Sequence, residues 1–155
     1  VGDRVVYYTR GDCGKEVLAQ FQHECMTHLP EIIRHENITT SRGIWYVFSS
    51  PYYRNVTKKD GSAYQLMKEI IRYNKEYDYI SRSTYKLSGI DLMQSVVGGM
   101  REYSSLPRSV VKALQEIVDV SSNCGSNVGF DLYKKNFGVN EYGTLIFRDP
   151  VYVRD

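Results

Sequence analysis

The sequence predicts an α+β fold in which a small β-sheet comes first, helices follow and a β-hairpin closes the chain. Three observations support this order: β-forming runs lie within residues 4–48, helical periodicity dominates residues 62–118, and turn residues separate two apolar runs within residues 137–147. Strands and helices that are segregated along the chain are typical of α+β domains. With 155 residues, 42% of them hydrophobic, the chain is long enough for one domain with its own core.

The N-terminal part is predicted to form a small sheet and one helix. Its segments are a strand at 4–9, a turn at 11–14, a helix at 15–28, a short strand at 31–34 and a strand at 44–48 that is rich in β-formers. Pro30 is expected to close the helix, because proline cannot join a helical hydrogen-bond ladder. Ser49-Ser50-Pro51 is expected to break the last strand.

The C-terminal part is predicted to be mainly helical. Its segments are helices at 62–79 and 90–97, a helix that begins at Pro107, a turn-rich loop at 121–126 and hairpin strands at 137–139 and 144–147. Gly98-Gly99 is expected to end or bend the second helix. The third helix has the most regular apolar stripe, formed by Val110, Val111, Leu114, Ile117 and Val118.

Charge, hydropathy and cysteine content limit the classes of protein to which this chain could belong. A net charge of +2 and a pI near 8.4 do not favour nucleic-acid binding, which depends on concentrated positive charge. No apolar run approaches the ~18 residues that a membrane helix needs, and no segment has the pattern of a signal peptide. Cys13, Cys25 and Cys124 are odd in number and widely spaced, which is more typical of reduced thiols than of a disulfide framework. These features predict a cytoplasmic protein that does not bind membranes.

Tyrosine is unusually frequent, at 14 of the 155 residues. Several of these tyrosines stand among polar residues, and they include Tyr73, Tyr77, Tyr79, Tyr85 and Tyr103. Tyrosine is enriched at protein interfaces because it offers a large contact area at a low cost in side-chain entropy. The same number of tyrosines is also expected if their rings are simply half-buried in the packing of ordinary helices. Both interpretations stand on the sequence alone.

One polar constellation near the end of the sequence points to chemistry. Asp131 and Asn136 lie on a loop that follows the third helix, and Asp149 lies at the end of the hairpin. Because a hairpin returns its second strand beside its first, we expect Asp149 to come back near Asn136. Carboxylate and amide oxygens suit Mg²⁺, and phosphoryl transfer needs metal ions held against phosphates. Taken singly, each of these residues is equally typical of a turn.

The constellation resembles a known catalytic site. The pattern Asp131-x-x-x-x-Asn136, followed by two short strands and Asp149, is similar to the catalytic loop and the metal-binding aspartate of protein kinases. The pairs Phe130-Asp131 and Asp149-Pro150 resemble the version found in the small early serine/threonine kinases of short-tailed bacteriophages.

The resemblance implies a fold and an activity. The fold would be a minimal protein-kinase-like domain over residues 1–155, with residues 1–50 as the N-lobe-like part and 51–155 as the C-lobe-like part. The activity would be Mg-ATP-dependent phosphorylation of serine or threonine in host proteins during host takeover, in the cytoplasm of the host cell. The implied cofactors are Mg²⁺ and ATP, and the implied partner is a host protein.

The resemblance also implies roles for individual residues. Asp131 would accept or orient the proton of the substrate hydroxyl. Asn136 and Asp149 would hold Mg²⁺ that is bound to the nucleotide phosphates. Lys134 or Lys135 would contact the transferred phosphate.

The N-terminal half departs from the kinase pattern. In kinases a strand carries a lysine that contacts phosphate, and a glutamate of the following helix pairs with that lysine. Glu24 matches the glutamate, but the strand position expected for the lysine holds Tyr7. Arg10 and Lys15 are nearby cations that stand off the matching position.

Further departures leave a second function open. Gly129 stands where many kinases have histidine, and Tyr133 stands where lysine or histidine is usual. The given residues hold no glycine-rich turn ahead of the strand at 4–9. A pseudokinase-like protein that binds and inhibits a host or defence protein would tolerate these losses. An unrelated α+β protein in which the motif is a coincidence is the third alternative.

Overall fold

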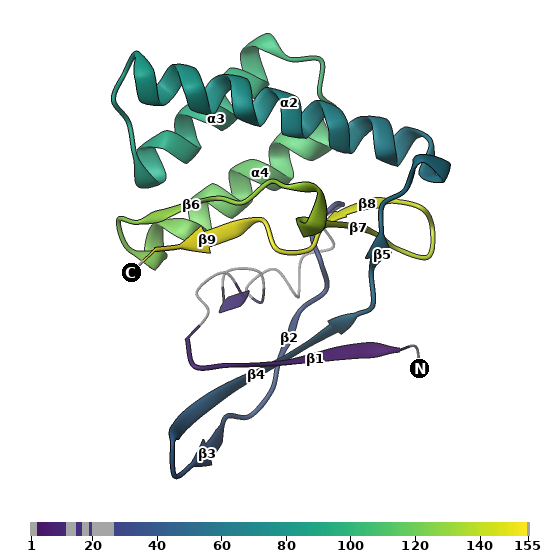
Figure 1. The fold of residues 1–155 in the computed structure, drawn as a ribbon, viewed down its shortest axis with the longest axis vertical. Coiled ribbons are helices and arrows are strands. Elements are labelled where there is room, and N and C mark those ends of the chain that lie inside the picture. The colour runs from purple at the N-terminus through teal and green to yellow at the C-terminus, as the bar shows by residue number, and fades with distance from the viewer. Residues whose placement is uncertain (1–2, 12–14, 17–18, 20–26, 155) are drawn as a thin grey trace.

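The computed structural model describes residues 3–11, 15–16, 19 and 27–154, and it has the expected α+β architecture. Figure 1 shows helices at one end of the molecule, the N-terminal sheet at the other end and pairs of short strands between them. The helices are α2 (Ser62–Ser83), α3 (Gly89–Tyr103) and α4 (Arg108–Ser121). Short 3-10 turns are η1 (Lys58–Asp60), η2 (Ser122–Cys124) and η3 (Lys134–Asn136).

Strand β4 (Gly43–Pro51) organises the N-terminal sheet. It pairs antiparallel with β1 (Arg4–Thr9), β2 (Ile33–Arg34) and β3 (Ile38–Thr40). The predicted strands at 4–9, 31–34 and 44–48 are confirmed in position, although β2 is shorter and β4 longer than expected. The sequence analysis missed β3, whose three residues are exposed and carry no alternation of burial.

The inner face of this sheet carries a small apolar cluster. Phe48 is fully buried and packs with Ile32 and Ala19, while Tyr7 and Tyr46 cover the cluster from its edge. Tyr7 stands directly opposite Phe48 in the register of β1 and β4. Tyr7 is therefore part of the packing of this sheet.

The predicted strand break at Ser49-Ser50-Pro51 is wrong. β4 continues through all three residues, and the Ser49 and Ser50 side chains are buried. Arg4 Nε donates to Ser49 Oγ at 3.2 Å, and His35 Nε2 lies 2.6 Å from the same oxygen. The Ser50 hydroxyl donates to Pro51 O at 3.1 Å, so both buried hydroxyls have partners, and strand pairing outweighs the local preference of serine and proline for a turn.

The predicted end of the second helix at Gly98-Gly99 is also wrong. α3 continues through both glycines, and a Cβ on Gly99 would lie 2.9 Å from the ring of Tyr77 in α2. Glycine therefore permits a close approach of the two helices, which offsets its low helix propensity. α2 extends four residues beyond the expected end at 79, and Ser81 Oγ meets Ser95 Oγ of α3 at 2.7 Å within this extension.

The third predicted helix is confirmed as α4. Pro107 occupies the position immediately before its first residue, where a missing backbone N–H costs least. All five residues of the predicted stripe are buried in the main core, which α2, α3 and the short strands complete. The most deeply buried of its large side chains are Phe137, Phe147, Met67, Ile70, Met93, Met100, Leu114, Ile117 and Leu132.

Two groups of short strands lie between the helices and the N-terminal sheet (Figure 1). The first has the order β5 (Arg54–Asn55), β7 (Phe137–Val139) and β8 (Leu145–Phe147), and it confirms the predicted hairpin. The second pairs β6 (Val128–Phe130) with β9 (Val151–Val153). The sequence analysis missed β5, β6 and β9, since each is too short to show a period.

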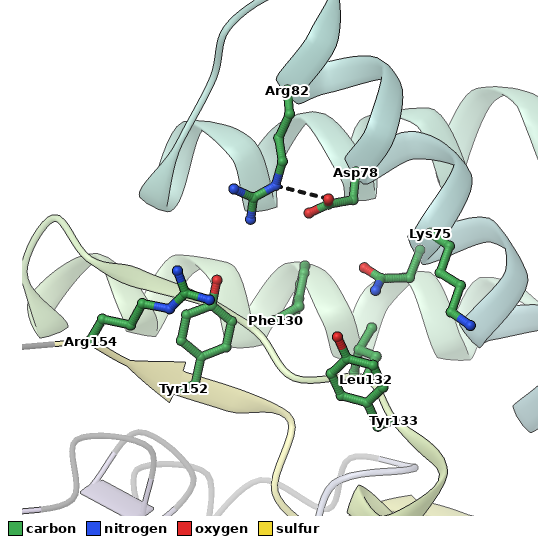
Figure 2. Close-up of a pocket in the computed structure, with 9 residues that line it drawn as sticks. Lys75, Asp78, Arg82, Phe130, Leu132, Tyr133, Tyr152 and Arg154 are labelled. Atoms are coloured by element: carbon green, nitrogen blue, oxygen red, sulfur yellow. Dashed lines mark hydrogen bonds and ion pairs between the residues drawn. The ribbon is translucent and has the colours of Figure 1, made fainter.

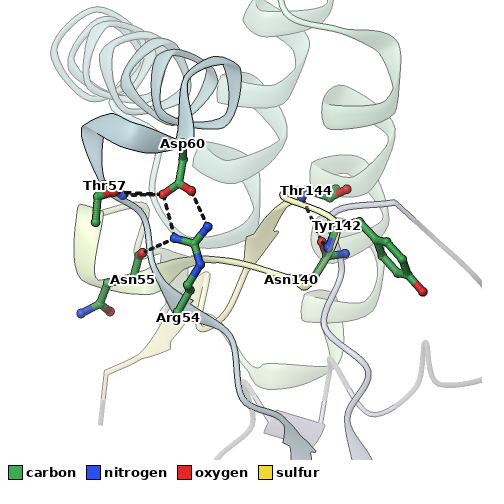
Figure 3. A network of polar contacts seen from close by, with 7 residues as sticks. All are labelled: Arg54, Asn55, Thr57, Asp60, Asn140, Tyr142 and Thr144. Carbon is green, nitrogen blue, oxygen red and sulfur yellow. Dashed lines mark hydrogen bonds and ion pairs between the residues drawn. The ribbon is translucent and has the colours of Figure 1, made fainter. Parts of the chain in front are cut away.

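An ion-pair network holds β5 in place. Arg54 donates through both terminal nitrogens to the Asp60 carboxylate, which also accepts the Thr57 backbone N–H at 2.7 Å (Figure 3). The hydrogen bonds from Arg54 and Thr57 lower the pKa of Asp60 to about 2, so this carboxylate stays ionised at ordinary pH. On the neighbouring hairpin, Asn140 Oδ1 closes the turn by accepting from the backbone N–H groups of Tyr142 and Thr144.

The first predicted helix falls mostly outside the described residues. Lys15, Glu16 and Ala19 are helical, whereas Thr27 and His28 form a turn, so the helix does not reach its predicted end at His28. Most of the predicted turn at 11–14 is likewise not described. Cys124 is disulfide-bonded, and the expectation of a reduced thiol is wrong for this residue. Within the described part of the chain, no helix combines the length and the apolar character needed to span a bilayer.

Candidate active site

The loop that carries Asp131 is fixed at both of its ends. It leaves β6, whose Phe130 stands opposite Val151 of β9. The Asp131 backbone N–H donates to Pro150 O at 2.7 Å, so the loop starts beside the residue that follows Asp149. Among the described residues, none donates a hydrogen bond to the Asp131 carboxylate. The oxygens of that half-buried side chain therefore remain available as hydrogen-bond acceptors.

Asn136 ties the two aspartates together. Its side-chain Nδ2 donates to Asp131 O at 2.7 Å, and its own carbonyl accepts the backbone N–H groups of Arg148 at 2.8 Å and Asp149 at 3.3 Å. Asn136 is only 7% exposed, which limits the orientations open to its amide. The hairpin thus returns Asp149 to Asn136, as the sequence spacing predicts, and all three residues meet at one place.

Arg148 fixes the hairpin strand just before Asp149. Its guanidinium donates to Lys135 O at 2.7 Å, to Tyr53 O at 2.8 Å and to Asn55 Oδ1 at 2.9 Å. These bonds join β5, η3 and the end of β8. The sequence analysis assigned no role to Arg148, because its three partners are far away in the sequence or are backbone atoms.

A lysine reaches Asp149 from the N-terminal half. Lys15 Nζ lies 3.4 Å from Asp149 Oδ1 and 4.8 Å from the centre of the Tyr7 ring. Lys15 is only 7% exposed, an unusual environment for a lysine unless a carboxylate accompanies it. A cation therefore stands beside the proposed metal ligand although the strand position holds Tyr7. Lys15 stands off the position that the kinase resemblance assigns to the lysine, and no local sequence pattern marks it as a site residue.

The remaining predicted site residues have different positions. Lys134 and Lys135 are exposed in η3, between Asp131 and Asn136, and their role stays a prediction. Glu24 lies outside the described residues. Arg10 lies away from the site, since its guanidinium donates to Arg42 O at 2.7 Å and stacks 4.9 Å from the Trp45 ring.

Asn136 and Asp149 are the residues that could hold Mg²⁺. The described residues contain no group of three or more His, Cys, Asp or Glu side chains that could hold a metal ion by themselves. Asn136 and Asp149 offer one amide oxygen and one carboxylate, and Asn136 Oδ1 accepts no hydrogen bond from a described residue. Mg²⁺ commonly takes one or two protein oxygens and completes its shell with phosphate and water, so the pair fits a nucleotide-bound Mg²⁺.

Packing explains one departure from the kinase pattern. Gly129 stands opposite Tyr152 in the β6–β9 ladder, and a Cβ at Gly129 would lie 2.5 Å from that ring. Any larger side chain there would have to displace the ring. The tyrosine on β9 therefore accounts for glycine at the position where many kinases have histidine.

His28 couples the N-terminal half to the hairpin. Its Nδ1 lies 2.8 Å from Leu145 O and its Nε2 lies 3.1 Å from Ser109 Oγ. Its backbone carbonyl accepts the Phe147 N–H at 2.8 Å, two residues before Asp149. Burial lowers the pKa of His28, and the hydrogen bond to Leu145 O opposes this effect only in part. The neutral ring is therefore the form that fits the fold.

This burial predicts a pH dependence of stability. Because the folded-state pKa of His28 is lowered, its contribution is complete above the unfolded-state pKa of about 6.5 and is lost as pH falls through the folded-state pKa. We expect the free energy of unfolding, measured by urea denaturation, to fall below pH 6.5. The fall should be smaller in His28→Asn, because Asn does not titrate and tolerates the positive φ of 76° at this position. Equal pH slopes for the two proteins would contradict the assignment.

The chain has been compared with known proteins, and no family model, curated protein or solved structure matches it.

Proposed function

We propose that the chain is a kinase-like phosphotransferase of the kind carried by short-tailed bacteriophages, which moves the γ-phosphoryl group of Mg-ATP to serine or threonine in host proteins. One observation carries the proposal: the Asn136 side chain is bonded to the Asp131 carbonyl while its own carbonyl holds the backbone of Asp149. Phosphoryl transfer needs positioning and charge stabilisation more than covalent chemistry, and this arrangement supplies rigid oxygen ligands.

Each of the three site residues has a role in the proposed reaction. The substrate hydroxyl oxygen forms a bond to the γ-phosphorus, the bond from that phosphorus to the β–γ bridging oxygen breaks, and ADP leaves. The hydroxyl proton passes to the Asp131 carboxylate, whose oxygens no described residue occupies. Asn136 and Asp149 would hold Mg²⁺, which supplies positive charge against the phosphate oxygens.

Lys15 takes the part of the phosphate-contacting lysine in this proposal. It is buried and its Nζ lies 3.4 Å from Asp149 Oδ1, so it would be within reach of the phosphate oxygens of a nucleotide whose Mg²⁺ is held by that carboxylate. The Tyr7 ring lies 4.8 Å from Nζ and helps to position the cation. In this proposal the cation that contacts phosphate is Lys15, which follows the strand, whereas in kinases it is a lysine on the strand, at the position that Tyr7 occupies here.

The first test is nucleotide binding. A ligand at 100 times its dissociation constant stabilises the folded state by about 2.7 kcal/mol, and thermal unfolding detects this easily. We expect Mg-ATP to raise the midpoint of unfolding and Asp149→Ala to lose the shift, because the variant lacks the carboxylate that holds Mg²⁺. Chelation of Mg²⁺ with EDTA should remove the shift in the unaltered protein.

The matched control is Glu141→Gln. Glu141 is exposed on the tip of the hairpin, and this change also removes one negative charge. The control should keep the full shift. If Asp149→Ala showed a shift of equal size, the nucleotide would have to bind elsewhere. If millimolar Mg-ATP produced no shift in the unaltered protein, the phosphotransferase proposal would be ruled out.

A second candidate function is inhibition of a host or defence protein by binding alone. The observation that favours it is an exposed group of tyrosines on α2, α3 and the turn between them, where Tyr79, Tyr85 and Tyr103 are 72%, 64% and 76% exposed. Tyr73 and Tyr77 stack beside them with ring centres 6.0 Å apart and are half-buried, in keeping with the packing interpretation. Tyrosines exposed to this degree offer contact area for a partner protein.

A further inference from the structure

A pocket of about 210 Å³ adjoins the loop that carries Asp131. Figure 2 shows that α2 forms its upper wall and that β6, β9 and the loop form its lower wall. Phe130, Leu132 and Tyr133, which flank Asp131 in the sequence, line this pocket. None of these pocket residues contributes to the Asp131, Asn136 and Asp149 arrangement. The pocket is therefore a neighbour of the proposed reaction centre and not a part of it.

The pocket is positively charged. It is lined by three cations, Lys75, Arg82 and Arg154, and by one carboxylate, Asp78, so cations outnumber carboxylates by two. Asp78 is already engaged, because Arg82 Nε donates to its Oδ2 at 2.9 Å (Figure 2). Among the described residues, neither Lys75 nor Arg154 has an acidic partner. Two cations thus remain for an anionic ligand.

The walls suit one side chain of a peptide. Of the lining residues, Leu132 is buried and Tyr133 is exposed, and the guanidinium carbon of Arg154 lies 5.1 Å from the centre of the Tyr152 ring. Guanidinium and ammonium groups bind carboxylate and phosphate oxygens through charge-assisted hydrogen bonds. A volume of about 210 Å³ is below the range typical of sites for whole cofactors, so a side chain fits better than a nucleotide.

We propose that this pocket binds an acidic side chain of the protein substrate, next to the serine or threonine that Asp131 serves. The substrate class would be serine or threonine in a glutamate- or aspartate-rich context. This inference rests on the proposed phosphotransferase function. The protein as a whole has a net charge of only +2, which favours a local acidic contact over the extended phosphate backbone of a nucleic acid.

The test compares two peptides and two pairs of substitutions. One fluorescent peptide has a serine between glutamates, and its counterpart has glutamines in place of the glutamates. Binding is measured by anisotropy, and transfer of labelled phosphate from Mg-ATP is measured separately. We expect the acidic peptide to bind about tenfold more tightly at low salt, since two charge-assisted contacts are at stake, and the preference to weaken as salt is added.

Lys75→Gln combined with Arg154→Gln should abolish the preference. These two side chains are chosen because they have no acidic partner, so their loss leaves the Asp78–Arg82 pair intact. Lys59→Gln combined with Lys112→Gln removes the same charge from exposed positions in η1 and α4 and should keep the preference. Unchanged preference in the pocket variant would overturn the inference.

The two assays separate the two proposals. Phosphate transfer to both peptides with equal binding would overturn the acidic-substrate inference and leave the phosphotransferase proposal standing. Selective binding of the acidic peptide without transfer to any peptide would support the pocket and count against the phosphotransferase. A single-stranded oligonucleotide that binds more tightly than the acidic peptide, and that loses binding in the pocket variant, would overturn the inference in favour of nucleic-acid phosphate.

Discussion

Asp131→Asn is expected to reduce phosphoryl transfer by about 10²- to 10⁴-fold, the range that a positioned general base contributes. The amide keeps the size of the side chain but cannot accept the hydroxyl proton. The backbone of residue 131 should stay in place, because its N–H donates to Pro150 O and its carbonyl accepts from Asn136, and the substitution changes neither backbone group. Transfer to a peptide and thermal unfolding, measured side by side, check the expectation.

The matched control for Asp131→Asn is Glu141→Gln. Glu141→Gln makes the same chemical change at an exposed position and should retain full transfer. Full transfer by Asp131→Asn would remove Asp131 from the catalytic role. If Asp131→Asn instead kept inhibition of a host or defence protein while substitution of Tyr85 or Tyr103 abolished it, the binding function would replace the enzymatic one.

Leu114→Ala is expected to lower the free energy of unfolding by about 2 to 5 kcal/mol. Leu114 is 0% exposed and lies at the centre of the α4 stripe in the main core, so its truncation removes buried apolar contacts and leaves a cavity. For a protein of this size each kcal/mol corresponds to roughly 2–4 °C in the unfolding midpoint. Calorimetry or urea denaturation would measure the loss.

Lys112→Ala is the matched control on the same helix. Lys112 is exposed, so its truncation should change stability by no more than about 0.5 kcal/mol. A loss at Leu114 that is no larger than the loss at Lys112 would mean that α4 does not pack as described. Both variants should keep the helix content of the parent protein in circular dichroism.

Elements with a local signal were predicted well from the sequence. The α4 stripe repeats at helical spacing, and the 140–143 turn separates two apolar strands, so both elements could be placed without knowledge of the fold. The return of Asp149 to Asn136 followed from the same hairpin. The catalytic roles of Asp131, Asn136 and Asp149 stay predictions, because placement alone does not establish them.

Features that depend on distant partners could not be predicted. Ser49 stays in a strand because Arg4 and His35 bond to its hydroxyl, and Gly99 stays in a helix because Tyr77 packs against it. Lys15 enters the candidate site through a contact with a residue more than a hundred positions away in the sequence. In each case the local residue preferences suggest one structure, and tertiary contacts select another.

If the chain is the proposed phosphotransferase, the contact between Lys15 and Asp149 affects the order in which metal and nucleotide bind. A bare divalent cation that approaches Asp149 meets the ammonium group already 3.4 Å from that carboxylate, and the two positive charges repel. A metal that arrives with a triphosphate brings negative oxygens that satisfy the ammonium group at the same time. Metal and nucleotide are then thermodynamically linked, since each raises the affinity for the other. Mg²⁺ without nucleotide is therefore expected to bind weakly at Asp149, where Lys15 already accompanies the carboxylate.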